Sequence, residues 1–309
     1  MILLFSFLEL EPVIREGLFY AYQELYREAE SCFVMVLDSY PEHPAGYFLL
    51  AGLKGLYIID LGKYELYPEM KALVDSCVKK GKRWIKKNPD DAWGYFFIGG
   101  AYTYLTFFHA LREDYVNTLG YGIKALSWVS RAVEIDSTLY DAYLGLGGYD
   151  YFKGIFPWWR SEKKRGLRKI ELAMRKGRFS HELAADGLAQ IYIREKKYKE
   201  AEDLLFSLLE QYPLSRTFRW PLVEIYMEEG RWEDALRVVR EMREVSRGKE
   251  NTPYVELSLA LLEGKALVAM GREKEAQEIL GKALDIECTN DEERKVKREI
   301  EKIYRRISP

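Results

Sequence analysis

Apolar residues recur three or four positions apart along most of the chain, with small residues at fixed places in the pattern. The segments 26–44, 198–215, 231–242 and 271–286 share one layout: an aromatic or polar start, an alanine three to five residues later, and large apolar residues after it. Positions spaced three and four apart lie on one face of an α-helix. The pattern therefore predicts successive amphipathic helices, and no segment alternates strongly enough to compete as a β-strand.

Small residues predict where paired helices touch. Two helices cross closely only where small side chains lie at the contact. The predicted anchors are Ala29, Cys77, Ala125, Gly166, Ala201, Ala235 and Ala276, and the large apolar residues that fill the space between units are Phe33, Val129, Ile170, Leu205, Val239 and Leu280. We expect seven helix–turn–helix units and a terminal helix over 290–307, which begins with a capping box formed by Thr289 and Glu292.

With these residues the sequence resembles the tetratricopeptide repeat (TPR) family. The resemblance implies an all-α, right-handed TPR-type superhelix of about seven units with a C-terminal capping helix. The segments PEHPAGYFLLAGLKG (41–55), GLGGYDYFKGIFPWW (145–159) and 175–205 are similar to an uncharacterised bacterial TPR group with elongated repeats. We expect residues 1–182 to form elongated, irregular units with aromatic and glycine-rich first helices. Residues 183–309 are expected to form regular units and the cap, in one continuous solenoid.

TPR scaffolds offer a concave groove lined by their first helices, so the resemblance implies a protein or peptide partner bound there. Projection of the helical pattern places a set of aromatic and charged side chains on that inner surface. The candidate groove residues are Tyr22, Phe48, Trp93, Phe96, Tyr104, Tyr151, Phe152, Arg194 and Trp220. The aromatic residues, and the neighbouring glycines Gly145, Gly147 and Gly148, are equally compatible with packing between helices.

Charge singles out one further segment. The chain holds 47 Lys and Arg against 49 Asp and Glu, which excludes a globally basic nucleic-acid binder. Residues 153–178, however, contain ten bases and two acids. Aromatic side chains beside clustered bases are typical of a surface that binds an anionic membrane or an acidic partner. A helix face exposed to solvent can show the same pattern, so this alternative stays open. The candidate patch is Phe156, Trp158, Trp159, Arg160, Lys163, Lys164, Arg165, Arg168 and Lys169.

Catalytic motifs are absent from the sequence: it contains no GxxxxGK[ST], GxSxG or HExxH pattern. Its three cysteines and three histidines are widely separated, which disfavours a disulfide framework and a histidine-based metal cage. Only His109 with Glu113, and His181 with Glu182, have a spacing that could join a site. We predict a protein that is not an enzyme, has no cofactor or metal, and does not bind nucleic acid.

Two functions and two locations follow as expectations. The first function is a protein–protein interaction scaffold; the alternative is a membrane-peripheral or apolar-ligand-binding TPR protein that docks through residues 153–178. The start MILLFSFLELEP has a short apolar run without a basic region or cleavage site. We expect a cytoplasmic protein, or a periplasmic or envelope-associated one if a leader has been removed. Four Asn and four Gln among 309 residues are typical of thermophilic proteins.

Overall fold

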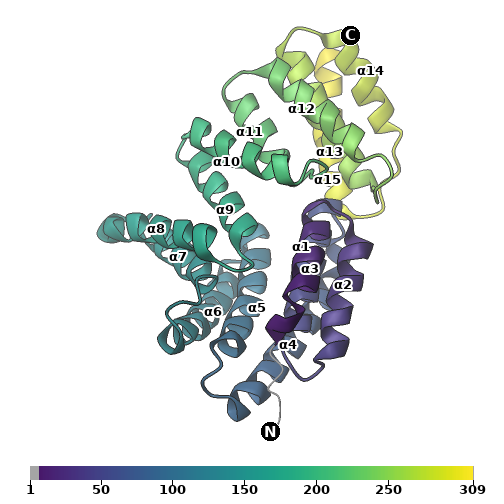
Figure 1. Cartoon of the computed structure of the whole chain (residues 1–309). Helices are drawn as coiled ribbons and strands as arrows, with labels where there is room; N and C mark the ends of the chain where they lie inside the picture. The colour runs from purple at the N-terminus through teal and green to yellow at the C-terminus, as the bar shows by residue number, and fades with distance from the viewer. Residues whose placement is uncertain (1–6, 309) are drawn as a thin grey trace. The chain divides into compact units, whose positions relative to one another are not determined.

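The computed structural model describes residues 7–308, and fifteen α-helices joined by short turns make up most of this range (Figure 1). No strand occurs among the described residues. The first helices are α1 (Glu11–Tyr22), α2 (Tyr26–Ser39), α3 (Ala45–Leu61), α4 (Tyr67–Lys87), α5 (Ala92–Leu111), α6 (Tyr115–Ile135), α7 (Ala142–Lys153) and α8 (Arg160–Lys176). The others are α9 (His181–Arg194), α10 (Tyr198–Gln211), α11 (Trp220–Glu228), α12 (Trp232–Val245), α13 (Pro253–Ala269), α14 (Glu273–Leu284) and α15 (Asp291–Ile307).

Seven successive helix pairs and a terminal helix confirm the predicted all-α TPR fold. The pairs run from α1 with α2 to α13 with α14, and α15 packs on both helices of the last pair. The described chain divides into two compact units. The first holds the described residues to Ala21, then Leu25–Leu56 and Glu65–Leu188; the second holds Tyr22–Glu24, Tyr57–Tyr64 and the chain from Ala189.

The predicted anchor positions are buried, and glycines among them bring helices into close contact. Ala29, Ala201, Ala235 and Ala276 are fully inaccessible to solvent. Within the α7–α8 pair, a methyl group added at Gly147 would lie 2.7 Å from the carbonyl oxygen of Gly166. Real side chains do not approach so closely, so glycine is needed there. Small residues thus set the helix spacing in both units, as the sequence pattern predicts.

The C-terminal helix buries one face and exposes the other. Ile300 and Ile307 are buried in a cluster that also contains Leu280 of α14. The predicted capping box was wrong by one residue: Asn290, rather than Thr289, accepts the hydrogen bond from the backbone N–H of Glu293. The Glu293 carboxylate in turn accepts hydrogen bonds from the backbone N–H groups of Thr289 and Asn290. The cap shifts because Asn290 takes the extended backbone conformation of an N-cap residue.

Gly154 and Pro157 interrupt the helical pattern of the apolar segment 151–159 and predict a loop, but the segment is partly helical. Its first three residues complete α7, and Pro157–Trp159 form a short 3₁₀ helix, η3, that leads directly into α8. Proline at the first position of such a turn costs no hydrogen bond, because that N–H has no partner inside the turn. The apolar start of the chain on which the location was predicted falls mainly on residues 1–6, outside the described residues. No helix of the described chain is long and apolar enough to cross a membrane.

Candidate functional site

A hollow on the second unit is lined by the first helices of three successive pairs, α9, α11 and α13. Its volume is about 370 Å³, and α11 supplies most of its wall. Five of the lining side chains are apolar and two are carboxylates. The residues of this α11 hollow are Gln190, Trp220, Pro221, Val223, Glu224, Met227, Glu228 and Leu262. Trp220, a predicted groove residue, forms part of the wall, whereas Arg194 lies exposed at the end of α9 and is not among the lining residues.

Negative charge gathers on one side of the α11 hollow. Glu224 and Glu228 are one helical turn apart, where like charges repel. Burial, and then the charge of Glu228, raises the pKa of Glu224. Glu228 accepts a hydrogen bond of 2.6 Å from the Tyr198 hydroxyl, which raises the pKa of Tyr198 to about 12. No ion pair with either carboxylate occurs among residues 7–308, so the hollow combines apolar surface with carboxylates that lack a basic partner.

A turn before α11 places Trp220 at the hollow. The Trp220 backbone N–H donates to the carbonyl of Arg216 at 3.0 Å, and the Arg219 guanidinium donates to the carbonyls of Ser215 and Pro213. Pro221 at the second position of α11 fixes the backbone as the helix starts. Trp220 is therefore the first residue of α11, directly after a turn whose position depends on Arg216.

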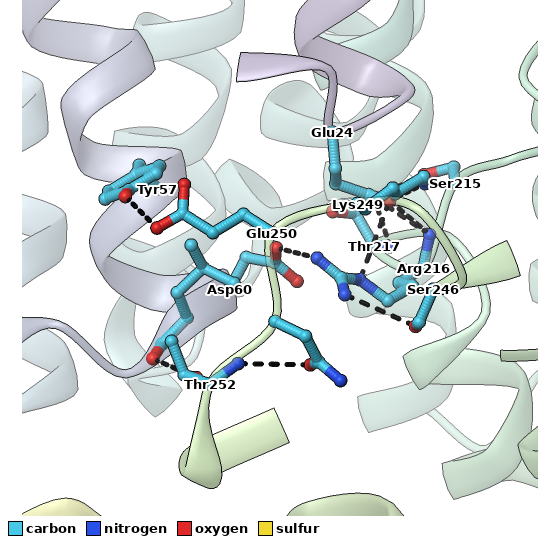
Figure 2. Close-up of polar contacts among 12 residues, drawn as sticks. Glu24, Tyr57, Asp60, Ser215, Arg216, Thr217, Ser246, Lys249, Glu250 and Thr252 are labelled. Atoms are coloured by element: carbon cyan, nitrogen blue, oxygen red, sulfur yellow. Dashed lines mark hydrogen bonds and ion pairs between the residues drawn. The ribbon is translucent and has the colours of Figure 1, made fainter. Parts of the chain in front are cut away.

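Arg216 lies at the centre of a buried ion network in the second unit (Figure 2). Its side chain is fully buried, and its guanidinium donates a 2.5 Å hydrogen bond to the Asp60 carboxylate. The Glu24 carboxylate accepts hydrogen bonds from the backbone N–H groups of Arg216 and Thr217, at 2.8 and 2.9 Å. Lys249 donates to the other oxygen of Glu24, also at 2.8 Å. Four segments far apart in sequence are thereby joined.

Sequence reasoning missed this network. Glu24 and Arg216 stand 192 positions apart, and a single sequence carries no signal for a pairing at that distance. One local clue exists: Glu24 has a φ of 55°, in the left-handed region that residues other than glycine rarely adopt. The hydrogen bonds from the turn around Arg216 hold it there. Because Glu24, Asp60 and Arg216 are buried, we interpret the network as structural, holding the turn that positions Trp220.

The predicted groove residues of the N-terminal half divide between core and surface. Tyr22 is buried in the second unit, its ring centroid 5.4 Å from that of Tyr212. In the first unit Phe48 packs 5.0 Å from Tyr104, and Trp93 packs 5.3 Å from Phe96. These four aromatic residues are partly buried. Tyr151 is buried, while its neighbour Phe152 is exposed.

The glycines in this region have different surroundings. A methyl group at Gly52 would lie 2.6 Å from the Tyr104 hydroxyl oxygen, and one at Gly100 equally close to the Phe48 ring. Aromatic side chains of the same unit therefore occupy the space beside these two helix positions. Nothing lies within 4 Å of such a group at Gly148. Of the three glycines noted in the sequence, Gly147 makes a close approach, Gly145 has ordinary contacts and Gly148 faces open space.

The aromatic and basic segment is largely on the surface of the first unit. Phe156, Trp158 and Trp159 are exposed. Asp150 accepts hydrogen bonds from Arg165 and Lys169, at 2.9 and 2.8 Å, so two bases of the predicted patch stabilise a buried carboxylate. The Lys163 ammonium lies 5.5 Å from the ring centroid of Tyr151. The remaining bases of the patch, Arg160, Lys164 and Arg168, are exposed on α8.

The two histidine spacings noted in the sequence do not form a metal cluster. His109 accepts or donates a hydrogen bond with the Tyr67 hydroxyl at 2.9 Å and with Asp114, not Glu113, at 3.0 Å. His181 contacts the carbonyl of Met174 at 2.8 Å. Among the described residues, no three His, Cys, Asp or Glu side chains lie together as metal ligands would.

Residues 123–298 match the family model described as "T7SS, ESX-1 secretion system protein EccA1, N-terminal domain", which is more than half of the chain. None of the curated proteins matches the sequence.

Solved structures of similar fold include helical-repeat proteins. The APC/C hetero-tetramer Cut9–Hcn1 aligns with a TM-score of 0.56 at 12% identity, over 93% of this chain and 53% of that one. PilW, a widely conserved type IV pilus biogenesis factor, aligns with a TM-score of 0.52 at 14% identity, over 80% of this chain and 98% of that one. A thermophilic TPR protein from Thermus thermophilus aligns with a TM-score of 0.46 at 20% identity, over 71% and 99%. At sequence identities this low, the comparisons bear on the fold and not on the function.

Proposed function

The chain belongs to the family of the EccA1 N-terminal domain, and from this premise we propose that it is a non-enzymatic scaffold that binds a peptide segment of a partner protein in the α11 hollow. The observation that supports this is the position of the hollow. It lies against the first helices of three successive TPR pairs, the surface on which such repeats bind ligands. We expect partners among components of secretion machinery, as the family's description suggests.

The chemistry of the α11 hollow favours a particular kind of peptide. Trp220, Met227 and Leu262 provide an apolar wall, which suits an apolar anchor residue. Glu224 and Glu228 carry negative charge that no described base neutralises. A lysine or arginine next to the anchor would relieve their repulsion, and its cation would gain about 0.5–2 kcal/mol over the Trp220 ring. The proposed ligand is therefore a basic peptide with an apolar anchor.

Peptide selection tests this function. The full chain is used to select from a random peptide display library, in parallel with Trp220→Ala and Glu224→Gln/Glu228→Gln variants. We expect the wild type to enrich peptides that place Lys or Arg beside an apolar residue. The tryptophan variant should lose them, and the glutamine variant should lose the preference for basic residues. Phe206→Ala and Glu233→Gln, exposed positions on the second helices α10 and α12, serve as matched controls.

Two results would speak against the proposal. The first is enrichment of the same peptides by the wild type and the Trp220 variant, which would place binding elsewhere. The second is loss of binding with the two control variants, which would indicate a non-specific effect. Circular dichroism of each variant checks that the helices remain folded.

A further inference from the structure

The turn between α7 and α8 exposes an unusual amount of apolar surface. Trp158 is 81% exposed, Phe156 54% and Phe152 61%. Ile155 and Trp159 are exposed as well, so five large apolar side chains face solvent within eight residues of chain. Contiguous apolar patches of this kind on a protein surface mark places where something binds.

The exposed side chains form an ordered cluster. The Trp159 ring lies 6.2 Å from Phe156 and 6.5 Å from Trp158, both in edge-to-face geometry. The Lys153 ammonium lies 5.3 Å from the Trp159 ring centroid, and Pro157 fixes the backbone between them. Bulky rings are thus presented at the outer end of a helix pair on a short, stiff turn.

A basic stripe begins where the apolar cluster ends. Arg160, Lys164 and Arg168 follow each other at intervals of four on α8, which places them on one face of the helix. All three are exposed, and within residues 7–308 none of them forms an ion pair. Arg165 and Lys169, on another face, are held by Asp150. The three bases without an ion pair in the described range therefore follow the aromatic cluster directly along α8.

A second apolar area lies at the end of the neighbouring pair. Val116 is 83% exposed and Leu119 67%, and Leu111, Tyr115 and Ile123 are also exposed. Helices α5 and α7 each contact α6, and short turns make each of them antiparallel to it, so α5 and α7 run in the same direction. Both turns, α5–α6 and α7–α8, consequently lie at the same edge of the first unit. Sequence reasoning did not identify this second area.

We propose that this edge of the first unit docks on an anionic membrane surface, with Phe156 and Trp158 inserted among the lipid headgroups and Arg160, Lys164 and Arg168 paired with lipid phosphates. Apolar side chains at the projecting ends of helix pairs suit a deformable surface, whereas a peptide would need a groove. Tryptophan favours the interfacial layer of a bilayer, and basic residues beside it bind anionic headgroups. The surface uses none of the residues of the α11 hollow, so it is independent of the proposed peptide binding.

Vesicle co-sedimentation of the full chain tests the proposal. We expect binding to vesicles of phosphatidylcholine with phosphatidylglycerol and much weaker binding to phosphatidylcholine alone. Replacement of the three stripe bases by alanine should weaken partitioning about 100-fold, since each base near an anionic surface contributes roughly a factor of five. Phe156→Ala/Trp158→Ala should weaken it at least about tenfold. Binding should also fall as salt rises from about 0.1 to 1 M, because the Debye length shrinks from about 10 to 3 Å.

The chain supplies matched controls. Lys79→Ala/Arg83→Ala/Lys86→Ala removes an exposed basic face of α4, and Val34→Ala/Met35→Ala removes exposed apolar residues of α2. Both variants should bind vesicles like the wild type. The replaced residues of the test variants are exposed, so their thermal unfolding should also be unchanged.

Three results would overturn the proposal: absence of binding to anionic vesicles, an equal loss of binding in the α4 control, or unchanged binding in the Phe156/Trp158 variant. Light scattering provides the last check. A dimer of the wild type that dissociates when Phe156 and Trp158 are replaced would assign this edge to a second copy of the chain instead.

Discussion

Replacement of Arg216 by methionine tests the role of the buried network. The side chain is fully buried, and methionine replaces its stem as far as Nε while removing the charged end. Asp60 loses its guanidinium partner, while Glu24 keeps Lys249 and its backbone donors. Removal of one partner from a buried ion pair costs about 3–5 kcal/mol, because the other charge stays buried and uncompensated. We expect a loss in this range for the second unit.

The companion variant Asp60→Asn separates pairing from packing. If the cost comes from an uncompensated carboxylate, Arg216→Met/Asp60→Asn should be more stable than Arg216→Met alone. The deficit of Arg216→Met should also shrink as the pH falls and the Asp60 carboxylate, which has lost its guanidinium partner, becomes protonated. Both expectations concern the same charge, so they should be met or fail together.

Hydrogen exchange measured by mass spectrometry is the suitable assay, because it reports each unit separately. Protection should fall in α11 and α12 of the second unit. Peptides from α5 and α6 of the first unit serve as an internal control and should be unchanged. A loss below about 1 kcal/mol, or a loss that Asp60→Asn does not reduce, would refute the interpretation that Arg216 is held by charge pairing.

Three further predictions concern stability. Ala235→Leu, at a fully buried helix contact, should cost about 1–3 kcal/mol in urea unfolding through overpacking, and a neutral result would refute the assigned contact. Truncation after Glu287 removes α15 and should expose apolar surface of the last pair, seen as aggregation in light scattering. Burial alone would raise the pKa of Asp150, but hydrogen bonds from Arg165 and Lys169 outweigh it and hold the pKa below 3.8. The resulting stability is present above pH 3.8 and lost as the pH falls through the folded pKa, so Asp150→Asn should flatten the acid side of the pH–stability curve.

The sequence by itself determined the helix pairs, their contacts and the terminal helix. These features depend on neighbours within one or two helical turns. Small residues such as Ala201 and Ala276, repeated along the chain, mark the positions where successive helices can pack closely. The apolar stripe that ends at Ile307 marks the face of the terminal helix that packs on the last pair. The local pattern even placed Trp220 on the first helix of its pair. It misjudged local details, such as the cap at Asn290 and the short helix Pro157–Trp159.

Only the tertiary structure decided which polar and aromatic residues meet, and which remain exposed. The buried ion network joins four segments that are distant in sequence, through Glu24, Asp60, Arg216 and Lys249. Helical periodicity reports only on neighbours along the chain, so it cannot predict these contacts. Periodicity is equally unable to tell an apolar face that another helix covers from one that faces solvent. Tyr151 is buried, whereas Val116 is exposed to solvent. The difference arises because a neighbouring helix covers the first side chain and no helix of the described chain covers the second.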